Sequence, residues 1–308
     1  MYSQTFAART ARLDPQHPLF QRASKVQRSG RGNSRFARLI LTLPRTESVN
    51  PLYLPPWAAR EPREEAIKRI SGPQGRTKET AAKDFLAFLP TIPAGDIQVF
   101  SNGLKSKATD GSTGGGFIAY QYGIQIDRKA FSLGLHAEVF DAEALAALNG
   151  ARAALASPAA KLATDIWVFL DNLEVALRLL SPFIGSSQQV FTDFQELARQ
   201  WPLRARLPHT PPGAIRVRWV PGHLNIPGNE EADKAAKEGA ALPAPPDAVC
   251  TLAALKRMAK EEARRAAIYL WAVTAPQSYQ ELSISHTQNT EELGLPRGAL
   301  GHILAARS

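Results

Sequence analysis

The pattern of hydrophobic and polar positions becomes regular near residue 96. Beyond it, three apolar segments separated by turn residues predict an antiparallel meander of strands over Ile97–Phe100, Phe117–Tyr122 and Ile124–Leu133. Apolar residues with helical spacing then predict a helix over Phe140–Ala156, with Asp141 as its N-cap and a Ser-Pro pair after its end. This part of the chain therefore begins with three strands and a helix.

The next elements continue the alternation of strands and helices. Ile166–Leu170 is a continuous apolar run, typical of a strand that is buried on both faces. Helices are expected over Leu173–Leu180 and Gln188–Trp201, and a strand over Ala214–Val220. A last helix is expected to begin near Asn229, a good N-cap residue. This order predicts an α/β fold with a mixed sheet.

The segments on either side have a different pattern. Basic residues and prolines interrupt the apolar positions before residue 96, which predicts an extended or poorly ordered arm with short helices only at Glu61–Ile70 and Ala81–Leu89. After a Pro-rich linker, Thr251–Thr274 predicts a basic amphipathic helix. We therefore expect three parts, namely a basic N-terminal arm over 1–95, one domain over 96–240, and a linker, helix and tail over 241–308.

Charge is distributed unevenly among these parts. The chain of 308 residues has a formal net charge of +9. Residues 1–95 contain 16 Lys or Arg and 7 Asp or Glu, whereas the basic and acidic residues of the remainder cancel. A surplus confined to one arm indicates a polyanionic partner such as nucleic acid, and it is also typical of a solvated arm that binds nothing.

Composition excludes several classes of protein. The single cysteine, Cys250, excludes a disulfide framework and a cysteine-rich zinc site, and indicates a reducing, intracellular compartment. The apolar runs are shorter than the roughly 18 residues of a membrane span, and no signal-peptide pattern opens the chain. A hydrophobic content of 44% is sufficient for a core. We expect an intracellular monomer without membrane contact.

Three acidic residues lie where predicted elements begin or end. Glu143 is in the first turn of the helix after the meander, Asp171 follows the central apolar strand, and Asp233 is in the first turn of the last helix. His223 lies on the Pro- and Gly-rich loop before that helix. Each residue alone has an ordinary explanation, as a helix-start charge or a turn residue. Together they predict a metal-dependent hydrolase, because magnesium prefers oxygen ligands and a two-ion site needs several carboxylates.

Three motifs carry a resemblance to a known family. They are Asp141–Ala147 (DAEALAA), Val168–Asn172 (VFLDN) and Trp219–Asp233, which contains the loop histidine. Through them, residues 96–240 resemble a type 1 ribonuclease H domain, closest to those attached to the reverse transcriptases of non-LTR retrotransposons. The resemblance implies a five-stranded mixed sheet flanked by helices. It also implies cleavage of the RNA strand of an RNA–DNA hybrid with two magnesium ions.

The resemblance implies a role for each matching residue. Three carboxylates would be the catalytic metal ligands: Glu143, Asp171 and Asp233. His223 would assist proton transfer or product release. Asn172 and Asn229 are expected to contact the substrate, and Asn229 would also support the start of the helix that carries the last carboxylate. The partner implied is an RNA–DNA hybrid or another nucleic acid.

The first strand departs from the family pattern. Where the family has an Asp-Gly-Ser motif whose aspartate contacts both metal ions, this chain has Asn102, Gly103 and Leu104. Asn102 keeps a carbonyl oxygen at this metal-ligand position but lacks the negative charge that helps to neutralise two dications. Thr109–Ser112 (TDGS) resembles the missing motif. No apolar strand precedes Asp110, however, and an Asp-Gly pair is typical of an ordinary turn.

These features leave more than one functional interpretation. The first is a hybrid-cleaving ribonuclease whose activity Asn102 weakens. The second is a non-catalytic nucleic-acid-binding module derived from a retrotransposon, which keeps the docking surface and the basic arm. An exonuclease or integrase of the same broad fold fits less well, since those families place their acidic residues differently and lack the histidine loop. Nothing before residue 95 is expected to hold a polymerase core, which favours a truncated element copy.

Overall fold

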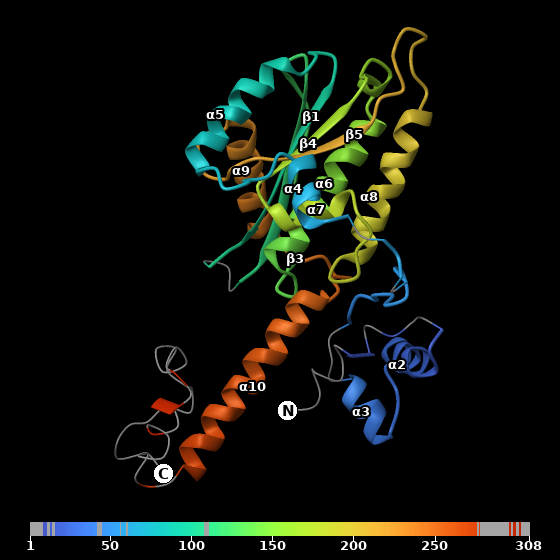
Figure 1. Ribbon diagram of the computed structural model, residues 1–308. Helices are drawn as coiled ribbons and strands as arrows, with labels where there is room; N and C mark the ends of the chain where they lie inside the picture. Colours follow the sequence, from blue (N-terminus) through green and yellow to red (C-terminus); the bar gives the residue numbers. More distant parts are fainter. Residues whose placement is uncertain are drawn as a thin grey trace.

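A five-stranded mixed sheet lies at the centre of this computed structural model (Figure 1). Its strands are β1 (Ile97–Lys105), β2 (Thr113–Gln121), β3 (Ile124–Gly134), β4 (Ile166–Leu170) and β5 (Ile215–Trp219). They lie in the order β3-β2-β1-β4-β5. The pairs β1–β2 and β2–β3 are antiparallel, whereas β1–β4 and β4–β5 are parallel. The predicted α/β fold with a five-stranded mixed sheet is confirmed.

The structure describes most of the chain. The described residues are 9–10, 13, 16–41, 45–55, 57–59, 61–107, 111–275, 277, 296, 298–299 and 302. Within them, no helix is both long enough and apolar enough to cross a membrane. Asp110, the alternative to Asn102 as a metal ligand, lies outside the described residues.

Helices cover both faces of the sheet (Figure 1). Their bounds are α5 (Lys78–Phe88), α6 (Val139–Ala156), α7 (Leu173–Leu179), α8 (Gln188–Gln200) and α9 (Pro227–Ala241). The side chains of Val99 and Val168 lie in a core cluster with residues of α6, α7 and α8. Their neighbours Phe100 and Phe169 lie in a second cluster with Phe85 of α5 and Ala232 of α9. The alternation along β1 and β4 therefore separates two hydrophobic layers.

The glycine run of β2 lets α9 pack directly on the sheet. A Cβ added at Gly114 would lie 2.0 Å from the backbone nitrogen of Ala240, and one at Gly116 would lie 2.5 Å from Ala235. Only glycine permits this approach. The second strand was expected to begin after these glycines, at Phe117. It instead contains them, because the backbone approach of α9 requires an extended strand without side chains there.

The N-terminal part is more helical than the sequence predicts. It contains α2 (Pro18–Ser29), α3 (Arg35–Leu41) and α4 (Arg63–Arg69) before α5. Ile70 is buried in the core with α6, and the backbone N–H of Trp219 donates to the Ile70 carbonyl at 2.8 Å. The segment around Ile70 thus covers the edge of β5. The short helices expected at Glu61–Ile70 and Ala81–Leu89 are present as α4 and α5, and residues from α4 onward pack with the sheet instead of forming an extended arm.

The predicted C-terminal helix is present as α10 (Leu252–Thr274), with Thr251 as its N-cap. Thr251 Oγ1 accepts a hydrogen bond from the backbone N–H of Ala254 at 3.2 Å. The Glu47 carboxylate also accepts from the backbone N–H of Leu252. From this anchored end, α10 extends away from the sheet (Figure 1).

Candidate functional site

Asn102 and Asp171 are neighbours on two parallel strands. The register pairs Phe100 of β1 with Phe169 of β4, and each candidate residue comes two positions later. Asn102 does not end its strand as expected, because pairing with β2 continues β1 to Lys105. Its side chain is buried, and its Oδ1 accepts a hydrogen bond from the backbone N–H of Gly103 at 2.7 Å. The amide is therefore held beside the end of β4.

Glu143 approaches this place from α6. The helix begins at Val139 with Glu138 as its N-cap, and Asp141 Oδ2 accepts a hydrogen bond from the Glu138 backbone N–H at 3.0 Å. Asp141 is thus the third helical residue rather than the N-cap, and Glu143 lies in the second turn rather than the first. A Cβ added at Gly103 would lie 2.8 Å from Glu143 Cγ. The glycine of β1 therefore makes room for the Glu143 side chain.

The Glu143 carboxylate is almost completely buried and incompletely hydrogen-bonded. The residue is 4% exposed, and none of the described residues bonds to Oε2. Burial raises the pKa of Glu143 well above its usual value, repulsion by Asp171 raises it further, and a hydrogen bond from the Asn172 side chain opposes both effects. A buried carboxylate oxygen facing a second carboxylate is an arrangement that a cation would stabilise.

Asp171 connects Glu143 to the histidine loop and to α9. Burial raises the pKa of Asp171; a hydrogen bond from the Asn229 side chain and the charge of His223 oppose this effect, and Asp233 adds to it. A Cβ added at Gly222 would lie 2.4 Å from Asp171 Oδ2, so the loop backbone lies directly against the carboxylate. The predicted site residues after β4 and β5 are therefore brought together.

The indole of Trp219 fixes the backbone beneath this carboxylate. Trp219 Nε1 donates a hydrogen bond to the Asp171 backbone carbonyl at 2.8 Å, and the Val220 backbone N–H donates to Leu170 at 3.0 Å. Trp219 was not among the predicted site residues, although it begins the motif that contains the loop histidine. Its hydrogen bond to Asp171 depends on the pairing of β4 with β5, which no local sequence pattern predicts.

The last helix begins earlier than the sequence predicts. Its N-cap is Ile226 and its first residue is Pro227, a position that proline favours because it needs no N–H donor there. Asn229 is therefore not the N-cap, and its side chain bonds to Asp171 instead. Asp233 lies in the second turn, is buried, and accepts a hydrogen bond at Oδ2 from Lys237 Nζ at 2.5 Å. This ion pair was also not predicted, although its i,i+4 spacing is a sequence signal.

Two asparagines hold the carboxylates from inside the protein. Asn172 Oδ1 accepts hydrogen bonds from the backbone N–H groups of Glu174 and Val175, which caps α7, and its side chain bonds to Glu143. Asn229 bonds to Asp171, and its Oδ1 has no partner among the described residues. These contacts orient the acids. Contact of either asparagine with a substrate stays a prediction.

His223 is exposed on a loop with unusual backbone angles. His223 has φ of 61° and Asn225 has φ of 56°, both in the left-handed region. Such angles are costly for residues with a side chain and occur where the surroundings enforce them. Pro221 and Ile226 on either side are buried and anchor the loop. His223 is thus presented to solvent beside Asp171.

The residues present fit one cation better than two. Within the part of the chain that the structure describes, no three His, Cys, Asp or Glu side chains are grouped so as to hold a metal ion. Asn102 is neutral, and the Asp233 carboxylate is engaged by Lys237. The unpartnered Oε2 of Glu143 is the feature that favours a cation. Hard oxygen donors are present, but the anionic charge needed between two dications is not.

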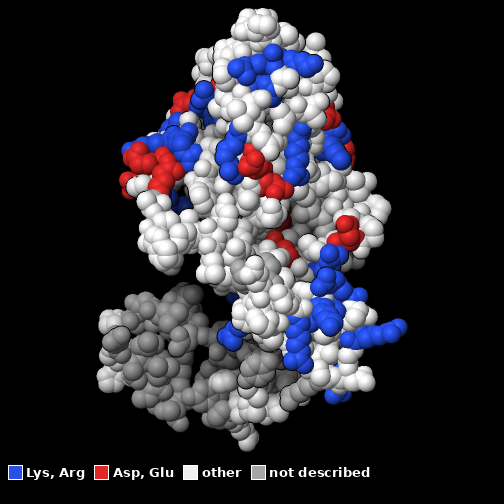
Figure 2. All heavy atoms as spheres, turned by 90° about the vertical axis from the view of Figure 1, so that its right-hand side faces the viewer, with Lys and Arg blue, Asp and Glu red and all other residues white. Residues whose placement is uncertain are grey.

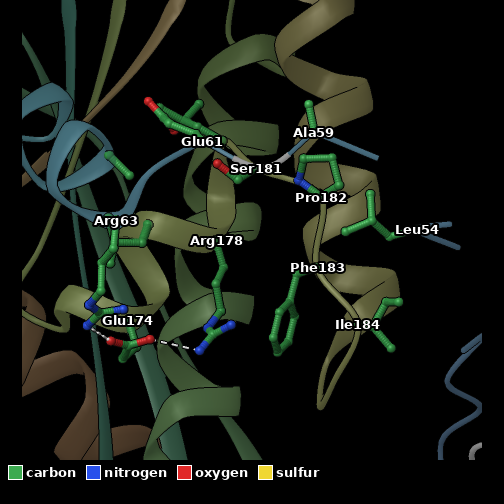
Figure 3. A pocket seen from close by; sticks show the side chains of 13 residues that line it. Leu54, Ala59, Glu61, Arg63, Glu174, Arg178, Ser181, Pro182, Phe183 and Ile184 are labelled. Carbon is green, nitrogen blue, oxygen red and sulfur yellow. Dashed lines mark hydrogen bonds and ion pairs between the residues drawn. The ribbon is translucent and has the colours of Figure 1, made fainter. Parts of the chain in front are cut away.

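A separate cavity of about 710 Å³ lies against α7 and contains none of the predicted site residues (Figure 3). Residues of the segment before α4 form one wall, and Ser181–Ile184 forms another. Figure 3 shows that Arg63 and Arg178 both point to Glu174, with which each forms an ion pair. Since its charged groups neutralise one another, the cavity does not extend the candidate site.

Comparison with known proteins finds similarity only among solved structures. No protein-family model and no curated protein matches the sequence. RNase H1 from the halophilic archaeon Halobacterium salinarum NRC-1 is 18% identical, over 47% of this chain and 96% of that one, with a TM-score of 0.35. LC11-RNase H1 in complex with an RNA/DNA hybrid is 13% identical, over 46% of this chain and 98% of that one, with a TM-score of 0.35.

A viral polyprotein gives a similar result. The prototype foamy virus protease–reverse transcriptase is 20% identical, over 48% of this chain and 21% of that one, with a TM-score of 0.37. In all three comparisons the match covers about half of the present chain. Identities of 13–20% and TM-scores below 0.5 do not transfer an activity to this chain.

Proposed function

We propose that the sheet domain binds an RNA–DNA hybrid and cleaves its RNA strand slowly. The observation that carries this proposal is the buried Glu143 carboxylate, which faces Asp171 while Oε2 has no partner among the described residues. Groups retained in this costly state are typical of functional sites. The motifs around Glu143, Asp171 and His223, which resemble type 1 ribonuclease H domains, supply the reaction and the substrate class.

One divalent cation, which we expect to be magnesium, fits these residues. Glu143 and Asp171 would hold it through carboxylate oxygens, and Asp233 would join them only when Lys237 releases its carboxylate. When bound, the ion would activate the attacking water and stabilise the leaving oxygen of the phosphodiester. A second ion would need anionic charge at Asn102, which offers only a neutral oxygen. Turnover should therefore be slow compared with a site that has four carboxylates.

The other residues of the site would orient groups and move protons. Asn172 and Asn229 would keep Glu143 and Asp171 directed into the site, since they already bond to these carboxylates. Trp219 would keep the end of β4 in place through the Asp171 carbonyl. The exposed imidazole of His223 would accept or return a proton near the leaving group.

The N-terminal helices support a nucleic-acid partner. Residues 16–41, which contain α2 and α3, include six Lys or Arg and no Asp or Glu. Arg22 lies over the ring of Phe36 at 4.9 Å and thereby connects the two helices. On the side of the molecule where α2 and α3 lie, the part below the sheet displays Lys and Arg side chains with few acidic ones (Figure 2). Such a surface would attract phosphates without regard to sequence.

A paired binding and cleavage assay tests the proposal. A labelled RNA–DNA hybrid should bind the full chain with or without magnesium, and its RNA strand should be cut slowly only when magnesium is present. Asp171→Asn should abolish cleavage and leave binding in place. Binding without any cleavage would instead support the second candidate, a non-catalytic binding module, which the neutral Asn102 favours. Absence of hybrid binding would contradict both.

A further inference from the structure

Arg218 on β5 is a half-buried arginine without a counter-ion. Its guanidinium lies over the ring of Phe88 of α5, 3.8 Å from the centroid. Its Nε is buried, and none of the described residues accepts a hydrogen bond from it. Among those residues the group also forms no ion pair, since the nearby Asp84 is bonded to Arg76 at 2.8 Å. The stacking thus fixes a positive charge that no residue neutralises.

Two other arginines of the described residues have the carboxylate partner that Arg218 lacks. Arg178 also has a buried Nε without a partner, but its terminal nitrogen forms an ion pair with Glu174 at 2.7 Å. Arg216, which lies two residues before Arg218 on the same strand, is paired with Asp165. Burial and the charge of Arg76 lower the pKa of Arg218, and the nearby Asp84 opposes them only in part, so the environment disfavours its charge. An anion from outside the protein would remove this cost.

The position of Arg218 points to the candidate site. The sheet register places Phe100, Phe169 and Arg218 in one row across β1, β4 and β5. Side chains alternate along a strand, so Asn102 faces the same side of the sheet as Phe100, and therefore as Arg218. From the spacing of strands and residues, the Arg218 and Asp171 Cα atoms are about 8 Å apart. The guanidinium itself lies over Phe88, whose ring also contacts Trp167, four residues before Asp171, so the phosphate that it binds would lie further along the strand than the one at the carboxylates.

We propose that Arg218 binds a backbone phosphate of the nucleic-acid strand that occupies the candidate site. The inference rests on the proposed function for its substrate class. Arginine suits this role because its planar guanidinium can donate two hydrogen bonds to one phosphate, and Phe88 holds that plane in position. The N-terminal segment would thereby contribute to substrate binding through α5, although it lies outside the motifs that carry the resemblance.

The test measures how hybrid affinity depends on salt. Arg218→Gln in the full chain should weaken binding of a labelled RNA–DNA hybrid by about 5- to 10-fold and lower the slope of log affinity against log salt by about one, the loss of one phosphate contact. Arg218→Lys should keep most of the slope, because it keeps the charge. Arg216→Gln is the matched control, with the same residue type and strand, and should leave the slope unchanged. Circular dichroism checks that each variant folds.

A second arm separates the nucleic acid from free phosphate as the ligand. Wild type and Arg218→Gln are titrated with inorganic phosphate in a thermal unfolding experiment. If phosphate stabilises only the wild type, and both proteins have the same slope of log hybrid affinity against log salt, the ligand of Arg218 is not a nucleic-acid strand. If the two slopes are equal and phosphate stabilises neither protein, Arg218 is not an anion-binding site. In either case normal hybrid binding would leave the proposed function standing, whereas failure of the wild type to bind any hybrid would remove it.

Discussion

Two pairs of acidic residues in this molecule have very different surroundings. Asp141 is buried and Glu47 half-buried between the N-terminal segment, α6 and the start of α10, whereas the buried Glu143 of α6 faces the half-buried Asp171 after β4. Burial raises the pKa of Glu47, and it also raises the pKa of Glu143, so both pay for desolvation. The difference is in the hydrogen bonds that each carboxylate receives.

The first pair is fully occupied by donors of the protein. Glu47 accepts hydrogen bonds from Ser186 Oγ and from the backbone N–H groups of Ser187 and Leu252. Asp141 accepts from Ser187 Oγ at 2.8 Å, from Thr251 Oγ1 at 2.6 Å and from the Glu138 backbone N–H at 3.0 Å. These bonds join segments far apart in the chain, so the pair is a structural link between them.

The second pair lacks this compensation. The Asn172 side chain lowers the pKa of the Glu143 carboxylate, but Oε2 is without a partner among the described residues. Burial of an acidic residue therefore does not by itself indicate a functional site. The acid whose hydrogen bonds are missing is the one that indicates a binding site, because the fold gains nothing from leaving it unsatisfied.

The largest effect on stability is expected at the satisfied pair. Glu47→Ala should lower the free energy of unfolding by about 3 kcal/mol, because it leaves the buried N–H groups of Ser187 and Leu252 without acceptors. Urea denaturation measures the change. Glu61→Ala removes an acid from a partly exposed ion pair with Arg69, and this control should change stability by less than about 1 kcal/mol. Equal effects of the two substitutions would refute the structural link.

Removal of the basic helices should separate binding from folding. Deleting residues 1–41 removes eight Lys or Arg and one Asp, yet keeps the segment around Glu47 that holds α10. Hybrid affinity should fall about 10-fold or more at moderate salt, with a flatter slope of log affinity against log salt. The midpoint of urea unfolding of the remaining chain should stay unchanged. An unchanged salt slope would show that these helices do not contact nucleic acid.

A smaller and opposite effect is expected at the unsatisfied pair. Glu143→Gln should raise the free energy of unfolding by about 1 kcal/mol at neutral pH in a chelating buffer, because it removes a desolvated charge that faces Asp171. Since the folded-state pKa of Glu143 lies above the ordinary 4.5, its contribution to stability is present below that value and is lost as pH rises through the folded-state pKa. The difference between the variant and the wild type should therefore grow with pH. A difference that stays constant from about pH 4 to about pH 8 would contradict the burial of a charge at this position.

The fold and the acidic candidates could be predicted because they depend on local patterns. The continuous apolar run of β4 and the alternation in β5 are short-range signals, and Asp171 and His223 directly follow these strands. The proximity of Asn102 to the end of β4 follows from the parallel pairing of β1 with β4 up to Phe100 and Phe169.

The remaining features depend on contacts between distant residues. β1 continues past Phe100 only because it pairs with β2, and Ile70 is buried only because α4 packs on the sheet. The starts of α6 and α9 were misplaced because Glu138 and Ile226 are weaker N-cap signals than Asp141 and Asn229. Pro227 was the local signal that could have corrected the second of these.

The most direct test of the central claim is magnesium-dependent cleavage of a labelled RNA–DNA hybrid by the wild type and by Asn102→Asp. The account predicts that both proteins bind the hybrid, and that the aspartate accelerates cleavage by about 100-fold or more, equivalent to about 3 kcal/mol of transition-state stabilisation. Asp110→Asn should change neither rate. The account would be contradicted by a wild-type chain that cleaves as fast as Asn102→Asp and loses its activity in Asp110→Asn, since Asp110 would then be the fourth ligand.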